Sequence, residues 1–115
     1  MKSTDLNKII TDILSTEYSC LFDKLRQQMM VTSFYKYGPV KNNYKQEKTL
    51  NAVDNIKLRL AKYDETGNTE FLADVANFAM IEFMYPQKDG AYYRPTESGS
   101  CVNAGFGVNE VKSFE

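Results

Sequence analysis

Histidine is absent from this sequence, and there are only two cysteines and three arginines. Without histidine, neither a Ser/His nor a Cys/His nucleophile pair can form, and Cys20 and Cys101 do not have the spacing of a zinc cluster. Any metal ion would therefore be a hard cation held by oxygen ligands. Because no signal-peptide pattern is visible and two cysteines are few for a secreted scaffold, we expect both thiols to be reduced and the protein to be cytoplasmic.

Excess charge and long apolar runs are also missing. Fourteen Lys and Arg against 15 Asp and Glu give a net charge of −1, so no overall field attracts the protein to nucleic acid, and non-specific nucleic-acid binding is disfavoured. The longest apolar run is far too short to span a membrane. The 115 residues, 43% of them hydrophobic, suit a single domain.

What the sequence does contain is helical periodicity, which predicts an all-α fold. Apolar residues three and four apart predict an N-terminal helical segment over 1–30, starting at Ser3 or Thr4, which Ser15, Thr16 and Glu17 could divide in two. Two further helices, about 46–64 and 69–85, predict an antiparallel hairpin spanning 46–85. Gly67 would end the first of these helices in the left-handed conformation, and Asn68 would cap the second.

Two segments lack helical periodicity. Residues 31–45 contain Gly38, Pro39 and three tyrosines, which predicts an ordered, locally basic loop with aromatic anchors. Residues 86–115 hold four of the six glycines and two of the three prolines, which predicts an irregular C-terminal segment. Because this segment still carries aromatic residues such as Tyr92 and Tyr93, we expect it to fold back over the helices as a lid or binding loop.

The helix over 69–85 is apolar almost all round except for Glu70, Asp74 and Asn77, which share one face at i, i+4 and i+7. A helix of this kind is normally buried, and a buried carboxylate without a partner is costly. The polar stripe should therefore meet a basic side chain, a second subunit, a metal ion or a ligand. One interpretation is a Mg²⁺ or ligand site; the other is a dipole-stabilised Glu70 and an ion pair between Asp74 and Arg59 or a lysine.

Basic and aromatic residues supply candidates for anion binding. Arg59 lies on the helix that opposes the stripe, and its guanidinium suits either a carboxylate or a phosphate. Tyr35, Lys36 and Tyr37 combine stacking surfaces with a cation, although the same run could simply anchor the loop. The candidate ligand-binding residues are Tyr37, Lys41, Asn43, Tyr44, Arg59, Asp74, Asn77, Tyr93 and Arg94, and the candidate metal ligands are Glu70 and Asp74.

A family resemblance is carried by KYGPVKNNY (36–44), RLAKY (59–63) and TGNTEFLADVANFAMIEF (66–83). This succession resembles a small family of phage and prophage proteins and, more distantly, the all-α NTP pyrophosphohydrolases of the MazG-like and phage dATP/dGTP diphosphohydrolase types. The resemblance implies a helical oligomer with a nucleotide pocket between helices, Glu70 and Asp74 at the metal position and Arg59 near phosphate. The MazG-like pattern also needs ExxE on the first hairpin helix and ExxD on the second. Here the first helix offers only Glu47 and Asp54, and Glu70 and Asp74 are one residue too far apart.

Three hypotheses follow. The first is a phage-derived protein that binds a nucleotide or nucleotide signal without turnover, as a sponge in counter-defence in the host cytoplasm, and needs no cofactor. The second is a Mg²⁺-dependent nucleotide pyrophosphohydrolase of the MazG-like type. The third is an inhibitor that binds a host defence protein, as anti-CRISPR proteins do. A homo-oligomer is expected because apolar side chains that include Met29, Met30, Met80 and Met84 would otherwise remain uncovered.

Overall fold

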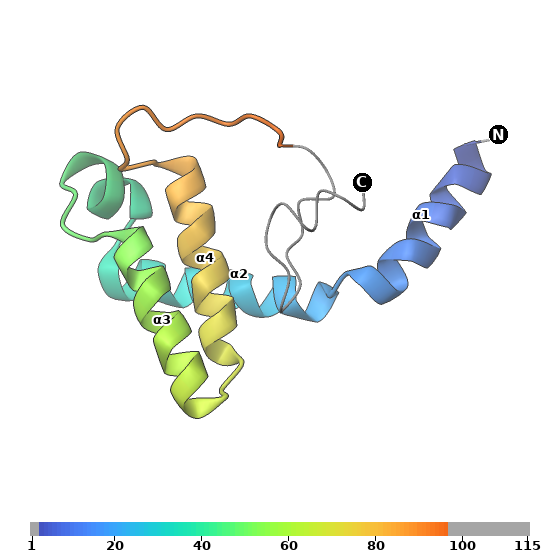
Figure 1. The fold of residues 1–115 in the computed structure, drawn as a ribbon, viewed down its shortest axis with the longest axis horizontal. Coiled ribbons are helices and arrows are strands. Elements are labelled where there is room, and N and C mark those ends of the chain that lie inside the picture. The colour runs from blue at the N-terminus through green and yellow to red at the C-terminus, as the bar shows by residue number, and fades with distance from the viewer. Residues whose placement is uncertain (1–2, 97–115) are drawn as a thin grey trace, which may run out of the picture.

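The structure, a computed structural model, describes residues 3–96, which form helices and their connections with no strand among them (Figure 1). The expected all-α fold class is therefore confirmed for this part of the chain. Four α-helices and one π-helical segment follow in order: α1 Ser3–Glu17, α2 Cys20–Tyr37, η1 Lys41–Gln46, α3 Ala52–Thr66 and α4 Glu70–Met84. None of the described helices is both long and apolar enough to cross a bilayer.

The N-terminal segment divides after Glu17. The hydroxyls of Ser15 and Thr16 do not break α1, because they donate to the carbonyls of Asp12 and Ile13 one turn back, at 2.6 and 3.2 Å. The division comes instead from Ser19, whose Oγ accepts a hydrogen bond from the Phe22 N–H at 3.0 Å and caps α2.

The expectation of a loop over 31–45 is wrong for most of that range. Helix α2 continues to Tyr37 and stops only at Gly38, whose φ of 82° is open to glycine and whose N–H donates to the Phe34 carbonyl at 2.8 Å. Pro39 then prevents any continuation. Residues 41–46 form the π-helical segment η1, closed by the Glu47 N–H donating to the Asn42 carbonyl at 2.9 Å.

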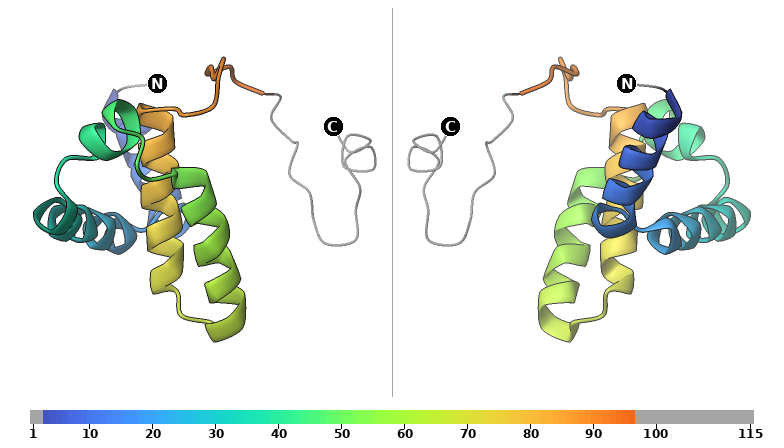
Figure 2. Two further views of the ribbon diagram at one scale, coloured as in Figure 1. Left: turned by 90° about the vertical axis from the view of Figure 1, so that its left-hand side faces the viewer. Right: turned by 90° about the vertical axis from the view of Figure 1, so that its right-hand side faces the viewer.

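Helices α3 and α4 lie side by side and antiparallel (Figures 1 and 2). Helix α3 begins at Ala52 and not near Gln46, because the Asn51 side chain accepts from the Asp54 N–H at 2.9 Å and caps it there. Gly67 ends α3 in the left-handed conformation with φ 73°, which confirms its expected role. Asn68 lies one position before the N-cap of α4, which is Thr69, and its Oδ1 accepts from the Glu70 N–H at 3.1 Å.

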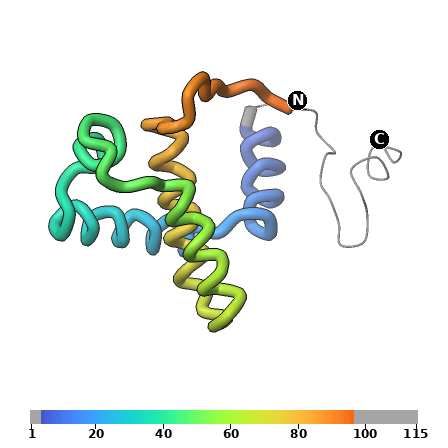
Figure 3. The backbone as a smooth tube through the Cα atoms, turned by 60° about the vertical axis from the view of Figure 1, so that its left-hand side comes forward, coloured from blue at the N-terminus to red at the C-terminus, as the bar shows by residue number. Residues whose placement is uncertain are grey.

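Helix α4 lies against both α2 and α3, and α2 crosses the α3–α4 pair (Figure 3). Burial on α4 is confined to one side, where Ala73, Asn77 and Ile81 are buried, while Phe83 and Met84 are exposed. The expectation that this apolar helix would be buried on every side is therefore wrong. The main core cluster joins Tyr44, Ala52 and Ile81, with Met30, Val40 and Phe78 packed against it.

The chain after α4 has no regular structure as far as residue 96. Gln87 holds the start of this stretch against η1, α4 and the connection before α3. The Gln87 Nε2 donates to the carbonyls of Tyr44 and Leu50 at 2.8 and 2.7 Å, and the Gln87 N–H donates to Glu82 Oε1 at 2.7 Å. Tyr92 and Tyr93 are largely exposed, so they do not anchor this stretch to the core as expected. The rest of the predicted irregular segment, with Cys101, lies outside the described residues.

Candidate ligand-binding site

A pocket of about 510 Å³ opens where α2, η1, α3 and α4 meet, and we call it the central pocket. Its existence depends on the crossing of α2 over the α3–α4 pair and on the turn at Gly38, which returns η1 to the same place. Six of the candidate ligand-binding residues line it, and they come from all four elements: Tyr37, Asn43, Tyr44, Arg59, Asp74 and Asn77.

Arg59 supplies the positive charge on the α3 side. Its NH1 donates to Asn55 Oδ1 at 2.7 Å, and its guanidinium carbon lies 5.0 Å from the centroid of the Phe78 ring, which together fix the head group. Guanidinium has five N–H donors, and Asn55 is its only hydrogen-bond partner among residues 3–96. Arg59 therefore keeps donors available to an anion in the pocket.

Asp74 faces Arg59 across the α3–α4 pair, with Nε and Oδ2 4.0 Å apart, so the two groups form a loose ion pair. Burial raises the pKa of the Asp74 carboxyl above its ordinary value of 3.8; Arg59 lowers it by less, and Glu70 adds to the rise. The ion pair expected as one of the two interpretations of the stripe is thus present, but it compensates the carboxylate only in part.

Asn77 is the most constrained polar side chain of the site, with 6% of its surface exposed. Its Nδ2 donates to the Arg26 carbonyl of α2 at 3.1 Å, which identifies the other amide atom as oxygen because the carbonyl requires a donor. Oδ1 is fully buried and has no hydrogen-bond partner among the described residues. A buried acceptor without a donor costs about 1–3 kcal/mol, so the position favours a ligand that brings an N–H or O–H group.

Tyr44 and Asn43 shape the wall formed by η1. Tyr44 is 5% exposed and belongs to the core, and burial raises the pKa of its phenol while Arg59 lowers it. Asn43 donates from Nδ2 to the Tyr37 carbonyl at 2.9 Å, which fastens η1 to the end of α2. Both residues therefore hold the pocket in shape as well as lining it.

A second depression of about 640 Å³ continues along α2 and the first turns of α4, and we call it the α2–α4 groove. It shares Thr32, Ser33, Lys36 and Asp74, among others, with the central pocket, so the two hollows are continuous. Glu70 lines the groove but is exposed. The expectation that both acids of the stripe are withdrawn from water is therefore wrong for Glu70, because it stands at the first residue of α4 beyond the packed part of the helix.

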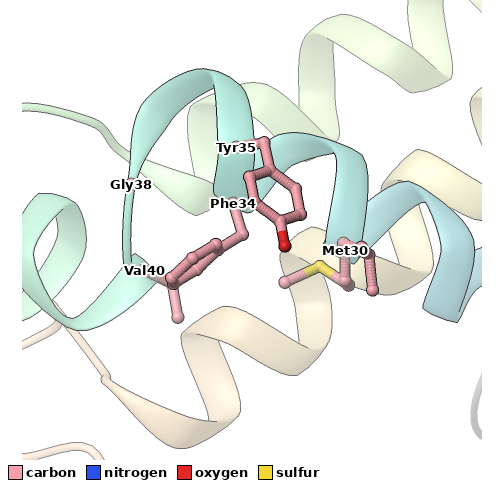
Figure 4. Close-up of a pocket in the computed structure, with 6 residues that line it drawn as sticks. Met30, Phe34, Tyr35, Gly38 and Val40 are labelled. Atoms are coloured by element: carbon pink, nitrogen blue, oxygen red, sulfur yellow. The ribbon is translucent and has the colours of Figure 1, made fainter.

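An apolar pocket of about 360 Å³ lies on the other side of the end of α2, where Figure 4 shows Phe34 and Tyr35 turned toward Met30 and Val40 around it. It shares Met30, Gly38 and Val40 with the central pocket. The part of the chain that the structure describes contributes no charged side chain to its lining, which suits an apolar group.

Three candidate residues are not part of the central pocket. Lys41 is exposed on η1 and does not line it, and Tyr93 and Arg94 are exposed in the stretch after α4. Tyr93 contacts the exposed ring of Phe83, with the centroids 6.1 Å apart. Tyr93 and Arg94 do not line the pocket, because the stretch after α4 does not return over it as far as residue 96.

The fold also brings to the pocket residues that were not candidates from the sequence, namely Ser33 and Thr32 on α2, Asn55 on α3 and Phe78 on α4. Asn55 could have been found, since it lies four residues before Arg59 on the same helix face. Ser33 and Thr32 could not, because they were assigned to a loop.

Comparisons with known proteins provide no assignment: no family model, no curated protein and no solved structure matches this chain. The resemblance of residues 36–83 to phage proteins and to MazG-like enzymes therefore stays a prediction.

Proposed function

We propose that this protein binds a small nucleotide-type ligand in the central pocket and does not turn it over. The proposal rests on two residues that line the same pocket: Asn77, whose buried Oδ1 has no partner among residues 3–96, and Arg59, which keeps donors available. A ligand that satisfies both must offer a hydrogen-bond donor and a negative charge. A nucleotide meets this requirement with the N–H groups of its base and with its phosphate.

The walls of the pocket agree with a planar ring. Tyr37, Tyr44 and Phe78 provide aromatic surface, and Met30, Val40 and Ile81 provide apolar surface. Lys36 at the junction with the α2–α4 groove adds a second cation near Arg59. Lys36 and Arg59 are two cations against the single carboxylate of Asp74 among the described residues that line the pocket.

Geometry argues against the alternative of a Mg²⁺-dependent pyrophosphohydrolase. Asp54 is in the first turn of α3 and Glu70 in the first turn of α4, so in an antiparallel pair of 15-residue helices they are at opposite ends, about 20 Å apart at 1.5 Å per residue. Asp74 faces a guanidinium, which competes with a metal ion for the same oxygens. Among residues 3–96 no three acidic or cysteine side chains gather in one place. We therefore propose binding without turnover in preference to this alternative.

The biological setting in the proposal comes from the sequence resemblance of residues 36–83 alone. In that setting, the protein is a phage-encoded sponge that sequesters a nucleotide signal of host defence in the host cytoplasm. The proposal also includes self-association, because many large apolar side chains are exposed in the single chain. Met29 and Met30, which we expected at a subunit contact, line the central pocket.

Isothermal titration calorimetry of the full chain against NTPs, dNTPs, cyclic dinucleotides and cyclic ADP-ribose isomers tests the binding. We expect one class to bind, and Arg59→Gln to weaken it about 10- to 100-fold, which is the loss of a charge-assisted hydrogen bond. Asn77→Leu should weaken it about 10-fold. Arg94→Gln is the matched control, since Arg94 is an exposed arginine outside the pocket and should have no effect.

Absence of heat with every member of the panel would refute the proposal. Equal weakening of ligand binding by Arg94→Gln and Arg59→Gln would show that the ligand binds outside the central pocket. Turnover is tested separately by chromatography of the bound nucleotide after incubation with Mg²⁺ or Mn²⁺. An unchanged nucleotide agrees with binding alone, whereas release of pyrophosphate that is lost in Asp74→Ala would establish the hydrolase in its place.

A further inference from the structure

Helix α1 is the part of the described chain with the least packing. The substantial helix contacts among residues 3–96 are those of α4 with α3 and with α2, and α1 extends from the start of α2 away from both α3 and α4 (Figure 1). An isolated helix of 15 residues is marginal in water. Something outside the described part of the chain must therefore stabilise α1.

The exposed residues of α1 form one apolar stripe. They recur three and four residues apart, so they share a face of about 140°. Each of the five is 42–53% exposed: Leu6, Ile9, Ile10, Ile13 and Leu14. The charged side chains Asp5, Lys8 and Asp12 are on the opposite face, so the stripe itself from Leu6 to Leu14 is free of charge.

The small core indicates that the missing partner is an obligatory one. Only four hydrophobic residues among those described are buried: Tyr44, Ala52, Ala73 and Ile81. Residues 3–96 taken by themselves would normally need a larger core to be stable. A partner required for stability must be present whenever the chain is made, and a second copy of the same chain meets this condition.

The shape and area of the stripe agree with a second copy. Ile10 is at its midpoint, four residues from Leu6 and four from Leu14, so two stripes can pair antiparallel about a two-fold axis with no charge opposed to a like charge. A fully exposed side chain of this size presents roughly 200 Å², so the five half-exposed residues of the stripe present roughly 470 Å² per copy. A pair of stripes buries roughly 900 Å² in total, close to the roughly 1,000 Å² that a specific interface needs.

We propose that α1 is the dimerisation arm of this protein: its apolar stripe pairs antiparallel with α1 of a second copy, about an axis near Ile10. This inference rests on the self-association in the proposed function and does not depend on the ligand. It leaves the central pocket of each copy open, because α1 does not contribute to that pocket.

Light scattering after size exclusion measures the mass of the full chain and of two variants. We expect the natural chain to be a dimer at micromolar concentration and Ile10→Asp to be a monomer. Lys8→Asp is the matched control, because it introduces the same side chain on the opposite face of α1, and it should remain a dimer. A monomeric natural chain, or a dimer that persists in Ile10→Asp, overturns the proposal.

Cysteine cross-linking keeps the proposal testable if Ile10→Asp fails to fold. In a Cys20→Ser, Cys101→Ser background, the added Ile10→Cys should form an intermolecular disulfide under mild oxidation. Asp12→Cys, on the far face, should not. Equal cross-linking of both variants, or none for Ile10→Cys in a chain that is dimeric, would overturn the arm-to-arm arrangement. Ligand binding measured by calorimetry is a separate readout, so failure of the pocket and failure of the arm are distinguishable.

Discussion

Replacing Asn77 by leucine should make the protein more stable while it weakens ligand binding. Among residues 3–96, no donor reaches the buried Oδ1 of Asn77, and Nδ2 makes one hydrogen bond, to the Arg26 carbonyl at 3.1 Å. Arg26 lies inside α2, where its carbonyl also accepts the helical i+4 N–H, so it is not left without a partner when Nδ2 is removed.

The expected magnitude follows from these two groups. Removing an unsatisfied buried oxygen recovers about 1–3 kcal/mol, and losing one neutral hydrogen bond costs about 0.5–1.5 kcal/mol. Leucine has as many side-chain heavy atoms as asparagine, and the slightly larger volume of its two methyl groups has room in the adjacent central pocket. We therefore expect Asn77→Leu to raise the free energy of unfolding by about 1 kcal/mol, or the melting temperature by about 4–8 °C for a domain of this size.

Urea unfolding followed by circular dichroism measures the change. Asn42→Leu is the control, since Asn42 is exposed on η1 and its replacement should change stability by less than about 0.5 kcal/mol. A loss of stability by 1 kcal/mol or more in Asn77→Leu would refute the reasoning. It would mean that Oδ1 is satisfied in the folded protein and that the amide is a structural bridge between α2 and α4, with nothing left for a ligand.

Three other measurements test the structure. The Asp74 carboxyl has a raised pKa, so the folded state binds its proton more tightly than the unfolded state does. Ionisation of Asp74 therefore lowers the free energy of unfolding as pH rises above 3.8, and this loss is complete above the raised pKa. Asp74→Asn should therefore exceed the natural chain in stability at pH 7, and the difference should vanish as pH falls through 3.8; an opposite sign would show that the Arg59 pair dominates. Gly67→Ala should cost about 1 kcal/mol in thermal unfolding because φ is 73° there, although a Cβ would meet no neighbouring atom, and Gly67→Asn should cost less. If folding and dimerisation are coupled, the melting temperature should rise with protein concentration, and a constant value between 1 and 100 µM would contradict that coupling.

Local signals in the sequence were sufficient for the class of fold. Helical periodicity and the left-handed requirement at Gly67 act within a few residues, so they can be recognised without tertiary structure. The same local reasoning failed at the end of α2. Val31 to Tyr37 include β-branched and aromatic residues of modest helix propensity. Met30 packs against the core cluster that contains Ile81 of α4, and the helix continues up to Gly38.

The polar stripe was visible in the sequence because its members are one helical turn apart, and the Arg59–Asp74 pair follows from the short connection between α3 and α4. The different degrees of burial of these side chains could not be predicted from the sequence. Only the crossing of α2 over α4 buries Asn77 against the Arg26 carbonyl, leaves Asp74 at the rim beside Arg59, and leaves Glu70 in solvent. The sequence by itself therefore determined which helices form and which residues share a face, because those are matters of spacing along one helix. The tertiary structure alone decided which polar atoms lose water, because burial depends on contacts between residues far apart in the chain.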